Sequence, residues 1–218
     1  MATLSQRLLV QAVDVRSKSN PKFIDVIKST GDGLVRVVDV AAADRADLVA
    51  NMLPTPPKWA ERLDRISATA TATIAEIERG HARSFTRTEE LDAEMNTALP
   101  AGGEAWHPTL IADLRAMDAA DRRIYLRSHD VAPSALAALK AYPLSATLVP
   151  PTELTDAIRS YNERAAPARA QELRDLTDYR FAVQSLIEDA RRIIRDIVEG
   201  RADVPTPTPE PTRSFTRL

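Results

Sequence analysis

Residues 58–80 read KWAERLDRISATATATIAEIERG, and this stretch decides the fold class. Side chains suited to a helix interface recur in it at alternating spacings of four and three residues: Trp59, Leu63, Ile66, Ala70, Thr73 and Ile77. This heptad-type spacing gathers them on one face of a helix, which Gly80 is placed to end as a C-terminal cap. Residues 66–74 also alternate with a period of two, so a strand is the minority alternative. A continuous helix explains the flanking residues better, and we predict a helix.

The residues before this helix contain one ambiguous stretch. Asn20-Pro21 predicts a helix start, because Asn caps a helix and Pro fits its first turn. We expect that short helix to end at Gly31, where the sequence TGDG is typical of a turn. Residues 34–40, LVRVVDV, alternate β-branched residues with others and are the best strand candidate. The alternative, which we favour, is a single helix over residues 34–53.

Two proline-containing runs interrupt the chain. One is PTPP at residues 54–57, directly before the stretch quoted above, and the other is PAGG at residues 100–103. Neither run can continue a helix. The second run marks the predicted boundary between an N-terminal helical part, residues 1–100, and a C-terminal helical part, residues 101–201.

Further helices are expected on both sides of that boundary. Thr88 is the predicted N-cap of a helix that runs to about Leu99, with acidic residues in its first turn. The longest predicted helix covers residues 152–199, is kinked or split at Pro167, and is ended by Gly200. Shorter helices are expected to begin at Pro108, Asp118 and Pro133, and an extended connector is expected over residues 143–151.

Composition supports a mainly helical chain and excludes several classes of protein. The chain has 218 residues, 44% of them hydrophobic and 28% charged, so it can bury a core. Its net charge of −2 argues against a protein that binds nucleic acid through bulk positive charge. The absence of cysteine excludes disulfides, Cys-based zinc sites and thiol nucleophiles. The predicted fold class is mainly α: an irregular multi-helix bundle with a long C-terminal helix and an extended proline-rich C-terminal arm.

No catalytic motif of a common enzyme class is present. The sequence has no glycine-rich phosphate loop and no G-x-S-x-G motif. Glu78 and His81 have the E-x-x-H spacing of helical di-iron sites, but such sites need a second pair, and the sequence has none. His107 and His129 are interpreted as loop histidines beside helix caps. We therefore expect a protein that is not an enzyme and that has no metal site and no cofactor.

The last residues differ in character from the rest of the chain. Residues 202–218 read ADVPTPTPEPTRSFTRL, and their alternating prolines favour an extended conformation. The pentapeptide RSFTR at residues 213–217 repeats residues 83–87. Apolar anchors and arginines at the tip suit a peptide that docks on a protein surface. The predicted partner-binding residues are Pro205, Pro207, Pro209, Pro211, Arg213, Phe215, Arg217 and Leu218.

These features favour a non-enzymatic structural or assembly subunit of a larger complex, such as a virion-like particle or an adaptor ring, whose arm docks on a neighbouring subunit. A helical body followed by an extended arm resembles the plan of adaptor and neck proteins of tailed phages; no motif carries that likeness, and it transfers no residue. One alternative is a monomeric helical adaptor or cargo-type module tethered to a partner by its C-terminal peptide. The other is a helical metal-dependent enzyme.

The expected partners are further copies of the chain and other protein subunits, contacted through the arm. Nucleic acid stays open as a partner, although the charge does not indicate it, and no membrane contact is expected. The N-terminal residues do not resemble a signal peptide. We therefore expect the protein to be made in the cytosol and to be cytoplasmic, or to be incorporated into a particle.

Overall fold

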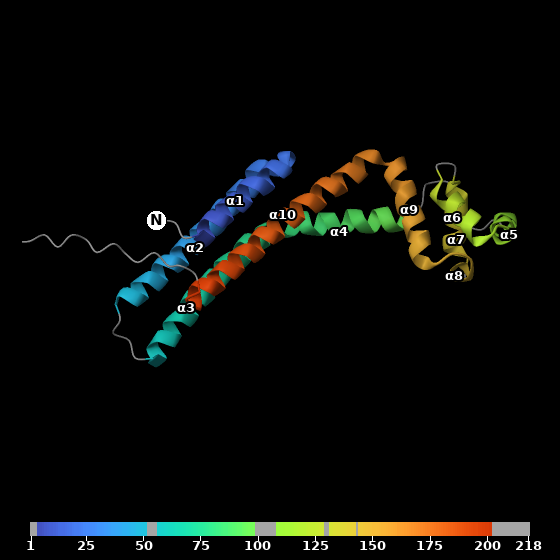
Figure 1. Ribbon diagram of the computed structural model, residues 1–218. Coiled ribbons are helices and arrows are strands. Elements are labelled where there is room, and N and C mark those ends of the chain that lie inside the picture. The colour runs from blue at the N-terminus through green and yellow to red at the C-terminus, as the bar shows by residue number, and fades with distance from the viewer. Residues whose placement is uncertain (1–3, 52–55, 99–107, 129–130, 143, 202–218) are drawn as a thin grey trace, which may run out of the picture. The chain divides into compact units, whose positions relative to one another are not determined.

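The computed structural model describes residues 4–51, 56–98, 108–128, 131–142 and 144–201, and it is helical throughout these ranges apart from short connections (Figure 1). No strand occurs in the described ranges, so the predicted mainly α fold class is confirmed. The elements are α1 (Leu4–Ser19), the 3₁₀ turn η1 (Pro21–Phe23), α2 (Ile24–Ala50), α3 (Pro56–Gly80), α4 (Ala82–Thr97), α5 (Pro108–Ala116), α6 (Ala119–Arg127), α7 (Pro133–Ala141), α8 (Ser145–Leu148), α9 (Pro151–Ala165) and α10 (Pro167–Val198).

Several helix ends lie at the residues that the sequence marks. Pro133 opens α7, where its missing N–H is not needed. The Asp118 carboxylate caps α6 by accepting a hydrogen bond from the backbone N–H of Asp121 at 2.8 Å. Gly200 follows α10 with a φ of +74°, a left-handed conformation that favours glycine. The predicted split of the long helix at Pro167 is confirmed, because a one-residue break separates α9 from α10.

The turn predicted at the sequence TGDG is wrong, and the helix does not end at Gly31. α2 runs through this sequence without interruption. A Cβ atom at Gly31 would lie 2.4 Å from Cγ2 of Val13, so glycine here permits the close approach of α1 and α2. Residues 34–40 belong to the same helix, which excludes the strand alternative for them. Leu34 and Val38, four residues apart on one helix face, are fully buried.

The helix start predicted at Thr88 is also wrong. α4 already begins at Ala82, and inside it the buried hydroxyl of Thr88 donates to the carbonyl oxygen of Ser84 at 2.8 Å. A threonine hydroxyl can cap a helix or bond back by one turn, and here it does the second. The connector predicted over residues 143–151 contains the short helix α8 instead, while Pro143 itself lies outside the described residues.

The described residues divide into two compact units. Unit 1 consists of the described residues up to Arg83 and from Asp178 onward, and unit 2 consists of those from Ser84 to Thr177. In unit 1, α1, α2 and α3 each contact the later residues of α10 through an arginine, and the predicted parts 1–100 and 101–201 stay a prediction. In the described ranges, no helix has both the length and the apolar character needed to cross a membrane.

Unit 1 is built on α1, α2, α3 and the residues of α10 from Asp178 onward. α1 lies beside α2, and α2 lies beside α3 (Figure 1). Arg16 of α1 links to α10 by donating to Ser185 Oγ at 2.5 Å and pairing with Asp189 at 3.2 Å. The largest fully buried side chains of this unit are those of Leu9, Ile27, Leu34, Val38, Ile74, Leu186, Ile187 and Ile197. Their removal from water is the main stabilising contribution.

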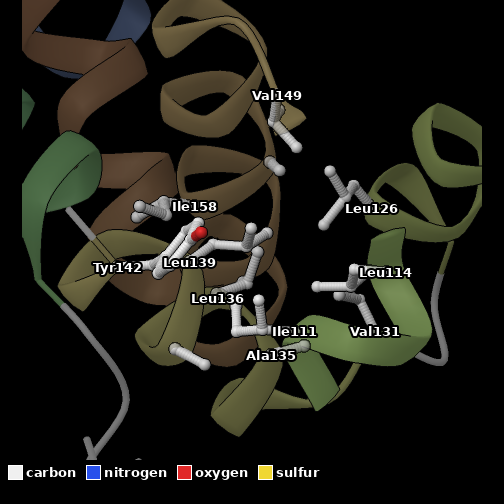
Figure 2. Packing of buried hydrophobic residues seen from close by; sticks show 12 residues of the cluster. Ile111, Leu114, Leu126, Val131, Ala135, Leu136, Leu139, Tyr142, Val149 and Ile158 are labelled. Atoms are coloured by element: carbon white, nitrogen blue, oxygen red, sulfur yellow. The ribbon is translucent and has the colours of Figure 1, made fainter. Parts of the chain in front are cut away.

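Unit 2 has a core of its own. Most side chains of its main buried cluster come from α5, α6, α7 and α9, and the rest come from the connections between these helices (Figure 2). Residues 135–139 of α7 are all buried, so this helix is surrounded on every side. The labelled members of the cluster are Ile111, Leu114, Leu126, Val131, Ala135, Leu136, Leu139, Tyr142, Val149 and Ile158.

One arginine satisfies carbonyl groups at helix ends in unit 2. Arg122 of α6 donates from Nε to the carbonyl oxygen of Leu114 at 2.8 Å and from Nη2 to that of Met117 at 2.9 Å. Its Nη1 donates to the carbonyl oxygen of Leu148. The last carbonyl groups of a helix have no partner inside the helix, and this single side chain supplies donors to the ends of α5 and α8.

Candidate docking groove

The stripe on residues 58–80 forms as part of α3, but most of it is not buried. Ala70 is 5% exposed, whereas the other stripe residues are half-buried: Trp59, Leu63, Ile66, Thr73 and Ile77. Ile74, which the heptad spacing leaves out, is 1% exposed and packs into the core. α3 therefore contributes its buried contacts through Ala70 and Ile74, and the rest of the stripe stays partly open to solvent.

A groove with a volume of about 310 Å³ lies between α2 and α3, entirely within unit 1. Its charged residues are Arg36 and Asp44, two turns apart on α2, and the rest of its lining is uncharged. Val40 is 57% exposed. The other lining residues are Gly33, Val37 and Ala41 of α2 and Ile66, Thr69, Ala70, Thr73 and Ile77 of α3.

Small residues keep the groove open. Gly33 has no side chain, and a Cβ atom there would make an ordinary contact of 3.5 Å with Cδ1 of Ile77. Ala41 and Ala70 supply only methyl groups to the seam between the helices. Moving large aromatic or aliphatic side chains of a partner from water into such an apolar gap lowers the free energy of binding. The groove is therefore a candidate docking site for apolar side chains.

The second notable arrangement in unit 1 is a polar cluster around His81, the residue between α3 and α4. His81 Nδ1 lies 2.5 Å from the hydroxyl of Tyr179, and Nε2 lies 3.1 Å from the hydroxyl of Thr30. The Thr30 hydroxyl donates to the carbonyl oxygen of Val26 at 2.7 Å, so it accepts from Nε2–H of His81. In the neutral imidazole, Nδ1 then accepts from the Tyr179 hydroxyl, and both nitrogens are engaged.

Burial accounts for the proton affinities in this cluster. Desolvation lowers the pKa of His81 from its usual value, because burial disfavours the charged imidazolium. Desolvation also raises the pKa of the Tyr179 hydroxyl, because it disfavours the phenolate. The ring of Tyr179 stacks on Phe23 at a centroid distance of 4.6 Å. The cluster is a joint between helices in which each hydroxyl and nitrogen has a hydrogen-bond role.

Glu78 and His81, which have the E-x-x-H spacing, face different partners in unit 1. Glu78 accepts from Arg191 Nη2 at 2.6 Å, while the nitrogens of His81 face Tyr179 and Thr30. Within the described ranges, no group of three or more potential metal ligands comes together. His107 and His129 lie outside the described residues.

The predicted partner-binding residues of the arm, Pro205, Pro207, Pro209, Pro211, Arg213, Phe215, Arg217 and Leu218, also lie outside the described residues. The internal copy of the pentapeptide, residues 83–87, is part of α4. Within unit 2, Arg87 of that copy pairs with Glu172 at 3.3 Å and with Glu90 at 3.7 Å. The internal copy is thus a helical segment with an ion-paired arginine.

The sequence predicts one wall of the groove and not the other. The spacing on α3 places the stripe on one helix face. The opposite wall, the face of α2 that carries Val37 and Val40, falls in residues 34–40, for which the sequence allows either a strand or a helix. Comparison of the chain with protein-family models, with curated proteins and with solved structures found no match.

Proposed function

We propose that this protein is a non-enzymatic structural or assembly subunit that associates with other protein subunits, its own copies included, and docks its C-terminal arm on a neighbour. The observation that carries the proposal is the apolar groove on α2 and α3, with Val40 57% exposed beside it. An apolar groove with charged residues only near its ends is the kind of surface that proteins use to bind a helix or a peptide.

The polar side chains of unit 1 support the same proposal. An active site needs polar groups that are free to meet a substrate, and often groups held in an unfavourable protonation state. The groups with shifted pKa values, His81 and Tyr179, are instead hydrogen-bonded to each other between helices. Their geometry is that of a helix joint, and it favours a role in holding unit 1 together.

The arm supports association with a neighbour. Its prolines favour an extended segment, which loses little conformational entropy when it is bound. Phe215 and Leu218 provide apolar anchors near its end, and Arg213 and Arg217 provide charges. A virion-like particle or an adaptor ring is the setting that we propose, on the likeness of plan to phage adaptor and neck proteins.

The test is a mass measurement on the full chain and on a chain that ends at residue 202. The full chain is expected to self-associate at micromolar concentration, and the shortened chain is expected to remain folded and to be largely monomeric. Light scattering after size exclusion measures the mass, and circular dichroism confirms the helical fold. A full chain that stays monomeric, and that needs its last residues to bind a separate protein, overturns the proposal in favour of a tethered adaptor.

A further inference from the structure

The point at which the described chain ends lies close to one end of the docking groove. Arg45 of α2 donates from Nε to the carbonyl oxygen of Ile197 at 3.1 Å, which fixes the end of α10 against α2. A Cβ atom at Gly200 would lie 2.8 Å from Nη2 of the same Arg45. Arg45 is the direct neighbour of Asp44, which lines the groove. The last described residues therefore lie against α2 at Arg45, one position along the helix from Asp44.

The groove and the arm differ in length. Along α2 the groove extends from Gly33 to Asp44, and the eleven steps between these residues, at a rise of 1.5 Å each, span about 16 Å. Residues 202–212 separate the last described residue from Arg213, and in an extended proline-rich conformation they span about 34 Å. Such a segment acts as a semi-rigid spacer and resists folding back on itself. An extended segment of that length is about twice as long as the groove, which favours the groove of a second copy as the acceptor of the tip.

We propose that the groove between α2 and α3 receives the tip of the arm, residues 213–218, from a second copy of the chain. This inference rests on the proposed function and names the acceptor surface for it. Phe215 and Leu218 enter the uncharged middle of the groove, where Val37 and Val40 offer apolar contact. The arm of each copy is then held by a neighbour, an arrangement that can close into a ring or continue along a particle.

The charges near the groove set a direction for the bound tip. Asp44 is an exposed carboxylate at one end, and Arg36 lies two turns away on the same helix. Arg213 and Arg217 of the tip are attracted by Asp44 and repelled by Arg36. We therefore expect at least one of these arginines to lie at the Asp44 end, so that an Asp44→Asn substitution weakens binding and an Arg36→Gln substitution does not.

The absence of cysteine from the chain permits a direct test by disulfide trapping. One sample carries Thr69→Cys in the groove, and a second sample carries Ser214→Cys in the tip, a replacement of nearly equal size. The two samples are mixed at micromolar concentration under mild oxidation. A matched control replaces Thr69→Cys by Ala68→Cys, which is exposed on the same helix but does not line the groove.

The expected result is a disulfide-linked pair of two copies that forms on the order of tenfold faster with Thr69→Cys than with Ala68→Cys, because docking raises the effective concentration of the tip. Adding Phe215→Ala to the tip sample is expected to remove that advantage. Equal rates for the two groove-side variants overturn the inference. So does a chain carrying both Thr69→Cys and Ser214→Cys that closes only within itself at every concentration.

The trapping experiment distinguishes the failure of this inference from the failure of the proposed function. A full chain that self-associates through its arm but shows no preference for Thr69→Cys leaves the assembly role standing and rejects the groove as its acceptor. A full chain that is monomeric at every concentration rejects both.

Discussion

The central helix of unit 2 and the α3 helix of unit 1 show two ways of using an apolar helix. α7 is buried over residues 135–139, with leucine and alanine facing in all directions. α3 buries Ala70 and Ile74 and leaves the remaining stripe half-exposed along the groove. A helix that is closed on every side contributes to stability, and a helix with an apolar face left over is available for association. The outer face of α3 therefore has apolar surface left to bury, whereas the core of unit 2 has none at residues 135–139.

Truncating a leucine in α7 is expected to give the largest loss in the free energy of unfolding. Leu136 is 0% exposed, and Leu136→Ala is expected to lower the free energy of unfolding by about 2–5 kcal/mol. The matched change in the groove is Ile66→Ala, where the side chain is half-buried and alanine is the better helix former. We expect that change to cost no more than about 1 kcal/mol. Urea unfolding followed by circular dichroism measures both, and equal losses contradict the distinction between closed and open helices.

Two glycines of α2 test the same contrast within a single helix. Gly31 is pressed against Val13, and a Cβ atom there would lie 2.4 Å from Cγ2 of that residue. Gly31→Ala is therefore expected to destabilise unit 1 by about 1–3 kcal/mol. Gly33 faces the groove, where a Cβ atom finds room, so Gly33→Ala is expected to stabilise the helix by up to about 1 kcal/mol. Thermal unfolding gives the midpoint temperature of each variant relative to the parent chain. Two shifts of the same sign would contradict the contrast between Gly31 and Gly33.

Several helix ends were predictable from single residues that dictate local backbone geometry, although the start expected at Thr88 was not correct. Pro133 and Pro167 begin helices, Asp118 caps one and Gly200 ends another, because each acts within one turn of the chain. Gly31 was misjudged as part of a turn because its partner, Val13, lies in another helix. Composition and period thus predicted the helical class, while the close approach of two helices left no local signal.

The candidate site was predictable only in part for the same reason. The period of the α3 stripe was correct, but whether a stripe is covered depends on what packs against it. The contact between His81 and Tyr179 joins residues 98 positions apart and has no pattern in the sequence. The extended arm stays a prediction from its prolines, and the groove that we propose as its acceptor depends on the positions of Gly33 and Val40 on a folded α2.

Units 1 and 2 also differ in how they satisfy polar groups between helices. Unit 2 uses the guanidinium of Arg122, which donates to three carbonyl oxygens. Unit 1 uses the neutral imidazole of His81 between Tyr179 and Thr30. Because an imidazole titrates near neutral pH, the joint in unit 1 should respond to pH.

This pH response is the smallest effect we expect. Burial lowers the pKa of His81 in the folded chain below the unfolded value of 6.5, so the unfolded chain binds the proton more readily. The contribution of His81 is fully present above pH 6.5 and is lost progressively as the pH falls through 6.5 toward the folded pKa. Protonation of Nδ1 also turns it from an acceptor into a donor facing the Tyr179 hydroxyl.

The measurement is the urea midpoint of unfolding at pH 7.5 and at pH 5.5. Between these two pH values, the midpoint should fall more in the parent chain than in His81→Gln. The other two histidines are common to both proteins and cancel in that difference. An identical pH dependence in the two proteins would show that the joint carries no proton-linked stability.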